Sequence, residues 1–537
     1  MTFLIRPPSA AKSRSGFIRL VPIGLSVLFL IISQCTQRRV ANPLPNVLEV
    51  SQDSLVFSLV AEGPAGPTQM VEVRNATGNP LTYQTTYKEP WLQVFDHSVT
   101  PDTIFVFASS RDLLQGTYRD TIKVTASTAE GSPHNIAVIM NVSRGIKTLP
   151  ANVTLTTLLG GPPLAQETLI VAPTGGGTMF FDITNTVPWL SISRLHGVGR
   201  DTLMMSFQTS GLARGRYTYN FQVAASQAAN SPISVACTLS VASWGTLTSN
   251  DSYGLRGIEF LTPGIGIAVG FKRTVLGVDG CVFRTTDSGV TWVPKMIAHG
   301  AALVGLRFLS PQLGYTFGEK GDLLVTRDGG ITWSFVLSSQ IETIFDLEIP
   351  APDTFYYVGG QGTIWCSFDN GVNWGSKTLP SAFPMYSAKF IDGHRGWVVG
   401  GGGTILYTDD AGDTWQQAPP VTNADLRNIF LLDSATGCIV GDAGTILSRI
   451  DGNKWVQQLS GVQLDLRKVQ FADRQIGWIV GEAVIVLHTK DGGQSWRQQA
   501  PNTSFGLFDV WFMDNRRGWV AGDNGLIMTT YSGGEDQ

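Results

Sequence analysis

Between residues 243 and 537, short apolar runs alternate with turns that are rich in Gly and Asp. The clearest unit spans residues 396–415 and reads Gly-Trp-Val-Val-Gly, a glycine turn, Thr-Ile-Leu-Tyr-Thr, and an Asp-containing turn that ends in Trp. Tryptophans close such units at spacings of 41, 41, 41, 40 and 41 residues: Trp292, Trp333, Trp374, Trp415, Trp455 and Trp496. A period near 40 residues with several short strands per unit is typical of a β-propeller that has one blade in each repeat.

Seven repeats are indicated by the glycines that end the second strand of each unit. These are Gly270, Gly318, Gly359, Gly400, Gly441, Gly481 and Gly522. The seventh copy, residues 518–530, has no closing tryptophan, whereas Trp244 stands just before the first copy. We therefore predict seven blades and a strand after Trp244 that serves as the outer strand of blade seven. Such pairing closes the ring and removes an exposed sheet edge.

The turn before the fourth strand reads Thr-x-Asp-x-Gly-x-Thr-Trp, with small variations. Its Asp is expected to accept hydrogen bonds from its own turn, and its Gly to adopt a backbone conformation that side chains disfavour. The Trp is expected to bury apolar surface between sheets. Because blades radiate from an axis, carboxylates at one place in five blades cannot converge on one catalytic site. We interpret them as turn formers: Asp287, Asp328, Asp369, Asp410 and Asp491.

This turn is the Asp-box, and the complete unit resembles the repeats of the photosystem II assembly and stability factor family over about residues 243–537. The Asp-box alone is shared with sialidases, sortilin-like receptors and xyloglucanases, but its combination with Gly-Trp-Val-Val-Gly is more specific. The resemblance implies a seven-bladed propeller without enzymatic activity that binds a membrane-protein client.

Two copies of another unit precede the propeller, in residues 48–145 and 146–242. Pro-Trp91-Leu corresponds to Pro-Trp189-Leu in the second copy, and a Tyr follows a Gly in both. Alternating short strands between Gly, Pro and Asn turns predict immunoglobulin-like β-sandwiches, with the Trp in the core and the Tyr closing a corner. The pattern resembles BACON-type domains of exported bacterial proteins. Such domains serve either as spacers or as glycan-binding modules, and both interpretations stay open.

Residues 1–35 resemble a bacterial lipoprotein signal, with a basic start, an apolar run over residues 20–32 and the lipid on Cys35. The apolar run is shorter than the roughly 20 residues that a spanning helix needs. A cleaved secretory signal and an uncleaved anchor are the alternatives. All three export the rest of the chain, so we expect a membrane-anchored protein in the periplasm or at the cell surface. Residues 36–47 are predicted to be a tether.

Composition and motifs limit the kinds of binding and catalysis that we expect of this protein. A net charge of −4 gives no sign of nucleic-acid binding. The four cysteines after Cys35 lack metal-ligand spacing, so we expect buried side chains and neither a metal nor a cofactor. We find no phosphate loop, no Ser-His-Asp order, and no carboxylate pair that spacing assigns to glycoside hydrolysis.

One position of the innermost strands is more informative. Fourteen residues before the glycine that ends the second strand stand Arg256, Val304, Phe345, Tyr386, Arg427, Arg467 and Phe508. Because blades share one geometry, we expect these side chains at one level near one end of the channel. Arginines and aromatics suit the docking of an acidic or extended peptide segment, and ordinary solvated strand ends are the alternative. Lys272 and Arg273, in an insertion of blade one over residues 271–277, are candidates for the same surface.

Two functions remain. The first is a membrane-tethered, non-enzymatic protein that presents its propeller to a protein client, in the manner of an assembly or stability factor. The second is a cell-surface protein that binds or processes glycans. Facing carboxylates at the channel mouth favour the second function, and a mouth of arginines and aromatics without such a pair favours the first.

Overall fold

The computed structural model describes residues 44–535, apart from 249, 251, 276, 298–299, 339–341, 361, 434–435 and 452–453. The predicted signal, its lipid on Cys35 and most of the tether lie outside the described residues. Strands make up the regular structure, as predicted, and the only helical elements of the described chain are three 3-10 turns: η1 Glu319–Gly321, η2 Gly401–Gly403 and η3 Asp442–Gly444. Within the described ranges, no helix has both the length and the apolar character needed to cross a bilayer.

The first β-rich region contains sheets with the strand orders β1-β3-β6-β5 and β2-β8-β7-β4. Alternate residues are buried along β2, which is the pattern of a strand with one face toward a core. Trp91 is buried, and the Tyr118 hydroxyl donates to the Leu114 carbonyl over 3.0 Å. The strands are β1 Leu48–Val50, β2 Ser54–Val60, β3 Gln69–Asn75, β4 Gln84–Thr86, β5 Leu92–Phe95, β6 Asp102–Ala108, β7 Gly116–Thr125 and β8 His134–Ser143.

The second β-rich region repeats these features in sheets of order β13-β15-β11-β9 and β10-β17-β16-β12-β14. Trp189 lies in the core, and the Tyr217 hydroxyl donates to the Ala213 carbonyl over 2.9 Å. The Trp and the Tyr thus play the same parts in both copies, as expected. The strands are β9 Gly145–Leu149, β10 Asn152–Leu158, β11 Glu167–Thr174, β12 Phe180–Thr184, β13 Leu190–Ile192, β14 His196–Val198, β15 Asp201–Phe207, β16 Gly215–Ala224 and β17 Ile233–Ala242.

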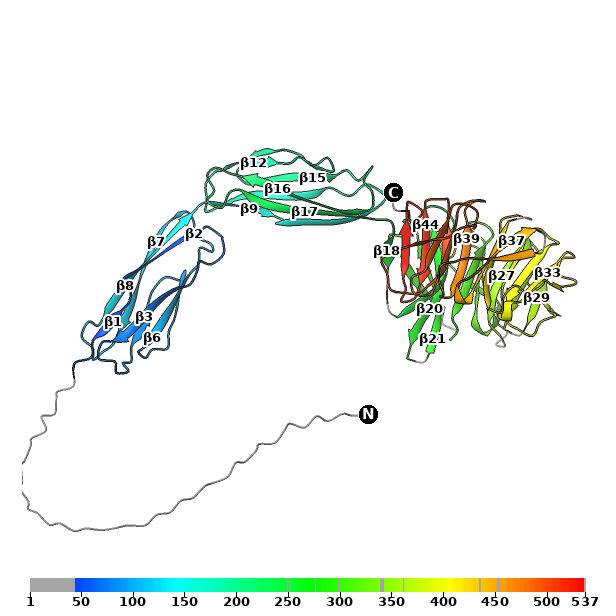
Figure 1. The fold of residues 1–537 in the computed structure, drawn as a ribbon, viewed down its shortest axis with the longest axis horizontal. Coiled ribbons are helices and arrows are strands. Elements are labelled where there is room, and N and C mark those ends of the chain that lie inside the picture. The colour runs from blue at the N-terminus through cyan, green and yellow to red at the C-terminus, as the bar shows by residue number, and fades with distance from the viewer. Residues whose placement is uncertain are drawn as a thin grey trace, which may run out of the picture. The chain divides into compact units, whose positions relative to one another are not determined.

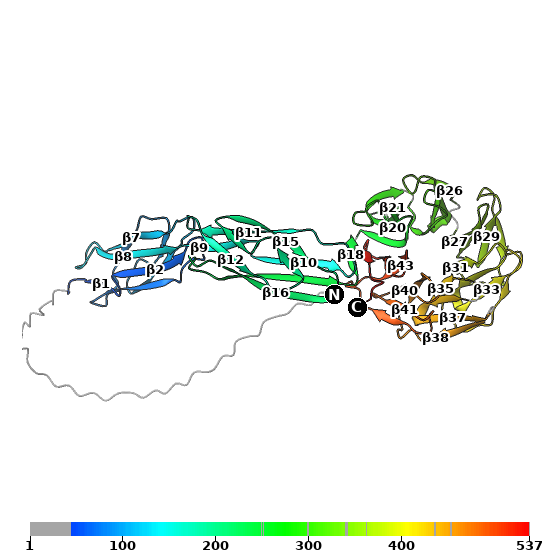
Figure 2. The same cartoon turned by 90° about the horizontal axis from the view of Figure 1, so that it is seen from above.

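The remaining chain folds as a propeller. Its described residues form seven four-stranded antiparallel sheets, which follow one another around an axis (Figures 1 and 2). The innermost strands contact their neighbours around the ring, and β19 contacts β43 to complete it. The first four sheets in chain order are β19 Tyr253–Phe260, β20 Gly266–Thr274, β21 Gly277–Thr285 and β22 Val293–Ile297; β23 Leu303–Phe308, β24 Gly314–Gly318, β25 Asp322–Thr326 and β26 Ser334–Ser338; β27 Ile344–Ala351, β28 Thr354–Gly359, β29 Thr363–Ser367 and β30 Gly375–Thr378; β31 Met385–Phe390, β32 Gly396–Gly400, β33 Ile405–Thr408 and β34 Gln416–Gln417.

The last sheet is built from both ends of this region. Strand β18 Gly245–Thr248 pairs with β45, which confirms the closure predicted from Trp244. The Trp244 indole donates to the Gln499 side chain over 3.0 Å. The last three sheets comprise β35 Leu426–Leu431, β36 Gly437–Gly441, β37 Thr445–Asp451 and β38 Lys454–Gln458; β39 Leu466–Phe471, β40 Gly477–Gly481, β41 Val486–Thr489 and β42 Arg497–Gln499; β18 with β43 Leu507–Phe512, β44 Gly518–Gly522 and β45 Ile527–Thr530.

The tryptophans divide into two classes. Those of the second strands, Trp397, Trp478 and Trp519, are at most 2% exposed. Trp478 stacks on Phe512 with ring centroids 3.4 Å apart. The Asp-box tryptophans pack against the hydrophobic clusters between sheets, as expected, but each is only half-buried. They follow a turn at the edge of the sheet, whereas a second strand has neighbours on both sides.

Candidate functional site

A cavity of about 340 Å³ occupies the propeller axis, and all seven aligned residues line it. We call these residues the mouth ring: Arg256, Val304, Phe345, Tyr386, Arg427, Arg467 and Phe508. In each of the seven innermost strands, the pairing register shifts across this position. The mouth-ring residue is therefore the extra residue of a β-bulge, a feature that redirects side chains and often lies beside functional sites.

The residue after each bulge forms a second level, which we call the collar: Gly257, Gly305, Asp346, Ser387, Asn428, Lys468 and Asp509. Several collar side chains accept a backbone N–H from the next blade. The Asn428 oxygen accepts from Val469 over 3.2 Å, and the Asp509 carboxylate accepts from Ile258 over 2.8 Å. Innermost strands have no strand on their axial side, so the collar satisfies backbone donors that would otherwise lack a partner. Its role is to tie blades together.

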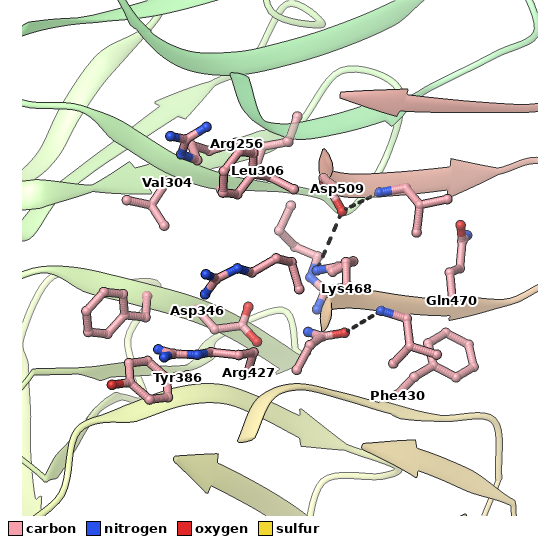
Figure 3. Close-up of a pocket in the computed structure, with 18 of the residues that line it drawn as sticks. Arg256, Val304, Leu306, Asp346, Tyr386, Arg427, Phe430, Lys468, Gln470 and Asp509 are labelled. Atoms are coloured by element: carbon pink, nitrogen blue, oxygen red, sulfur yellow. Dashed lines mark hydrogen bonds and ion pairs between the residues drawn. The ribbon is translucent and has the colours of Figure 1, made fainter. Parts of the chain in front are cut away.

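A third level, the floor, lies two residues further along: Glu259, Arg307, Glu348, Lys389, Phe430, Gln470 and Trp511. Figure 3 shows Val304, Tyr386 and Arg427 toward one end of the cavity, Phe430 and Gln470 toward the other, and Lys468 with Asp509 between them. The Glu348 carboxylate accepts from both Arg307 and Lys389. Contact with Glu348 raises the pKa of Arg307.

The mouth arginines are held by carboxylates. Arg427 donates through Nε to Asp442 over 2.7 Å and lies 4.4 Å from the Tyr386 ring. The bond to Asp442 raises the pKa of Arg427. Arg467 is paired with Asp465 and Glu482.

Arg256 is paired with Asp523 at 3.2 Å and lies 3.6 Å from the Phe508 ring, while burial lowers its pKa. These pairs reduce the positive charge that the sequence suggested for the mouth. What remains is a set of guanidinium planes fixed in orientation by carboxylates and aromatic rings, which suits directional hydrogen bonding.

The mouth ring has two unlike halves. Val304, Phe345 and Tyr386, from three consecutive blades, form an apolar half in which the two aromatic rings lie 5.3 Å apart, edge to face. Arg427, Arg467 and Arg256 lie in the other half. A bound segment would therefore meet apolar surface on one side and directional donors on the other.

Lys272 and Arg273 do not line the cavity. The insertion that contains them lengthens β20 and β21 into a hairpin in which Arg273 pairs with Val278. The Arg273 guanidinium lies 5.4 Å from the Phe271 ring, and that of Arg256 lies 5.1 Å from the same ring. Phe271, which our sequence reasoning missed, thus connects the insertion to the mouth ring.

The acidic partners were also missed, although a signal for them exists. Asp442, Glu482 and Asp523 each follow the glycine that ends a second strand. Reading one more repeat position in the same alignment would have placed three carboxylates beside the three arginines.

Carboxylates do line the cavity, but most of them are already bonded. Asp346 accepts from the Ala388 N–H over 3.1 Å, Asp509 from Ile258, and Glu348 from two cations. Glycoside hydrolysis needs one protonated acid and a second carboxylate available as base or nucleophile. Burial raises the pKa of two of these carboxylates, that of Glu259 to about 7 and that of Asp509, but Asp509 is already bonded to the next blade.

The Asp-box aspartates are turn formers. The Asp287 carboxylate accepts from the backbone N–H and hydroxyl of Thr291 over 2.8 and 2.6 Å. Gly289, at φ +87°, donates its N–H to the Thr285 hydroxyl. Bonds of this kind, led by those from the residue four positions after the Asp, lower the pKa to about 2 in Asp287, Asp328, Asp369 and Asp410. Asp491 makes the equivalent bonds to Ser495 and Thr489.

Among the residues that the structure describes, we find no site for a metal ion and no exposed thiol. They include no group of three or more His, Cys, Asp or Glu side chains placed to hold a metal ion. Cys237, Cys281, Cys366 and Cys438 are buried free thiols, and burial raises the pKa of Cys237 to about 11.

Comparison with known proteins identifies the repeats. Residues 380–450 and 421–504 match the family described as photosynthesis system II assembly factor YCF48, and no curated protein matches the chain. Among solved structures, "YCF48 bound to D1 peptide" is 20% identical, covers 54% of this chain and 97% of its own, and has a TM-score of 0.46. YCF48 from Cyanidioschyzon merolae is 19% identical, with coverages of 54% and 99% and a TM-score of 0.45.

The WD40 β-propeller domain of Doa1 is 12% identical, with coverages of 53% and 94% and a TM-score of 0.44. The family match lies wholly within the propeller and spans less than half of the chain. It confirms the resemblance drawn from the Asp-box and the Gly-Trp-Val-Val-Gly strand, and it identifies the propeller as one of the photosystem II assembly factor type.

Proposed function

We propose that this protein is a non-enzymatic binding protein whose seven-bladed propeller docks an extended segment of a protein client at the mouth ring. The observation that carries the proposal is the β-bulge repeated in all seven innermost strands, which directs seven side chains of four kinds, Arg, Val, Phe and Tyr, into one cavity. A purely structural ring would need only one kind of residue at that position.

The client's chemistry follows from the two halves of the mouth ring. The apolar half suits an aliphatic or aromatic side chain, and the fixed guanidinium groups suit backbone carbonyls or a carboxylate of the client. The solved YCF48 structure holds a D1 peptide, and we extend peptide binding to this chain as part of the proposal. The client is a membrane protein, and the role is that of an assembly or stability factor.

The rest of the chain supports this role. We propose that the N-terminal segment exports the protein and anchors it through Cys35, and that the two immunoglobulin-like regions act as spacers. The propeller then acts outside the cytoplasm, in the periplasm or at the cell surface.

A glycan partner is the second candidate, and one observation favours it. In the first β-rich region, Met70 and Phe105 face each other across strands β3 and β6 and are 55% and 36% exposed. Phe95 is 58% exposed and lies edge to face with Phe107. Exposed aromatic groups of this kind stack on sugar rings as well as on proteins.

The test is a pull-down from detergent-solubilised native membranes with the full-length protein and an Arg256→Ala, Arg427→Ala, Arg467→Ala variant. A membrane protein captured by the native form and lost with the variant supports the proposal. The matched control removes three exposed cations from outer strands and turns: Lys454→Ala, Arg474→Ala, Arg497→Ala. Equal capture of the membrane protein by both triple variants contradicts the proposal. Capture of polysaccharide alone favours the glycan function instead.

A further inference from the structure

Glu259 differs from the other carboxylates of the channel in having almost no partner. Its carboxylate accepts one hydrogen bond, from the Phe308 N–H over 3.2 Å. No cation lies within ion-pair distance of it among the described residues. Arg307 is near enough to act on its charge, but the Arg307 guanidinium is bonded to Glu348 on the other side.

Glu259 of blade one lines the cavity beside Val304, Gly305 and Leu306 of blade two. At the collar, these blades have Gly257 and Gly305, where the other five have side chains. At the mouth ring, blade two contributes Val304, the smallest of the seven residues, which lies near Arg256 of blade one in Figure 3. Leu306 and Phe317 occupy the space beside the two glycines, so the feature that eases entry is the small side chain of Val304 at the mouth ring.

We propose that Glu259 binds the ammonium or guanidinium end of a Lys or Arg side chain that enters the channel past Val304. This inference rests on the proposed function, because the side chain belongs to the client segment docked at the mouth ring. A half-buried carboxylate with one hydrogen bond has free acceptor sites, and a cation would fill them with charge-assisted bonds. The depth of the floor favours the two longest cationic side chains.

An anion fits the same space less well. Arg307 and Lys389 share Glu348, and Lys468 faces Asp509 at 3.9 Å. An incoming carboxylate would therefore compete with existing partners, and it would also approach Glu259.

The ionisation of Glu259 gives the proposal a pH signature. Burial raises its pKa to about 7, opposed by the charges of Arg307 and Lys468 and reinforced by that of Asp509. A bound cation favours the ionised carboxylate, so binding expels a proton near neutral pH. Affinity for the cation should rise between pH 6 and pH 8.

The test uses small probes that need no client. Butylammonium and butylguanidinium are titrated against the detergent-solubilised full-length protein by ligand-observed NMR, with butanol as the uncharged control. We expect both cations to bind in preference to butanol, and Glu259→Gln, which keeps an acceptor for Phe308, to weaken them about tenfold or more. Val304→Phe should narrow the path and weaken both cations while leaving Glu259 in place.

Asp413→Asn is the matched control, since it neutralises a propeller carboxylate outside the cavity lining whose side chain is 74% exposed. It should leave probe binding unchanged. Equal binding of butanol and the cations, no binding of either cation, or cation binding unaffected by Glu259→Gln overturns the inference. Probe binding is measured without a client, so such a result does not contradict the mouth-ring proposal. That proposal is tested by the pull-down.

Discussion

The Asp-box turns and the mouth ring are two positions of the same repeat, yet they behave in opposite ways. Asp287 and Asp410 sit in turns with nearly superimposable hydrogen bonds. At the mouth, seven equivalent positions hold Arg, Val, Phe or Tyr. The turn stabilises the backbone within one blade, so nearly the same residues recur in five of the seven copies. The mouth residues share one cavity, so their differences make a single asymmetric site.

Blade five shows that the two positions vary independently. Its Asp-box is replaced by a short hairpin between β37 and β38, and Arg449 lies 4.2 Å from the Trp397 ring. Its mouth residue Arg427 is nevertheless fully engaged with Asp442 and Tyr386. Loss of the turn motif therefore does not disturb the mouth.

The largest effect should come from the packing that both positions depend on. Trp478 is fully buried and stacked on Phe512, so Trp478→Ala should lower the free energy of unfolding by about 3–5 kcal/mol. Chemical denaturation of the full-length variant measures this loss. The half-buried Asp-box residue Trp496 gives the comparison, because Trp496→Ala should cost clearly less. Equal losses would mean that the turn tryptophans carry as much of the packing as the strand tryptophans.

A change at the mouth should alter binding more than stability. Arg427→Lys keeps the charge but loses the forked contact with Asp442 and the planar contact with Tyr386. We expect it to weaken binding of the captured client about tenfold, since a lysine cannot reproduce bidentate geometry. Surface plasmon resonance with the client measures the change. Binding at the native level would show that charge alone matters there.

A change at the Asp-box should do the reverse. Asp410→Ala removes the acceptor for the Thr414 N–H and hydroxyl and should lower the melting temperature without affecting client capture. The low pKa of Asp410, about 2 in the folded state against a usual 3.8, gives stability that is present above pH 4 and lost as pH falls toward 2. The variant should therefore lose less stability than the native protein on acidification. Reduced client capture by a folded Asp410→Ala variant would contradict the division between turn and mouth.

The last comparison concerns the pH dependence of stability. The pKa of Glu259 is about 7 in the folded protein against a usual 4.5, so its stabilising contribution is complete below pH 4.5 and is lost as pH rises through 7. Glu259→Gln should melt at a higher temperature than the native protein at pH 8 and at a similar temperature at pH 4.5. Thermal scans at both pH values measure this, with Glu482→Gln as the control. Parallel curves for native protein and Glu259→Gln would show that folding does not shift the pKa of Glu259.

The sequence by itself determined whatever repeats or is local. The 41-residue spacing of tryptophans gave the blades their order, the Thr-x-Asp-x-Gly pattern specified its own turn, and Trp244 marked the strand that closes the ring. Alignment of the repeats also placed the seven mouth-ring residues at one level. Blades share one backbone geometry, so residues at the same position of each repeat lie at the same height along the propeller axis.

Only the tertiary structure decided what those residues meet. The collar bond from Asn428 and the single hydrogen bond of Glu259 each join two blades, and the pairing of Arg427 with Asp442 joins the two ends of one hairpin. Their partners are separated along the chain by one strand, one repeat or more, and no local propensity couples them. Closure of the ring brings these charges into one desolvated channel, where burial and neighbouring charges rather than residue type set how each carboxylate behaves.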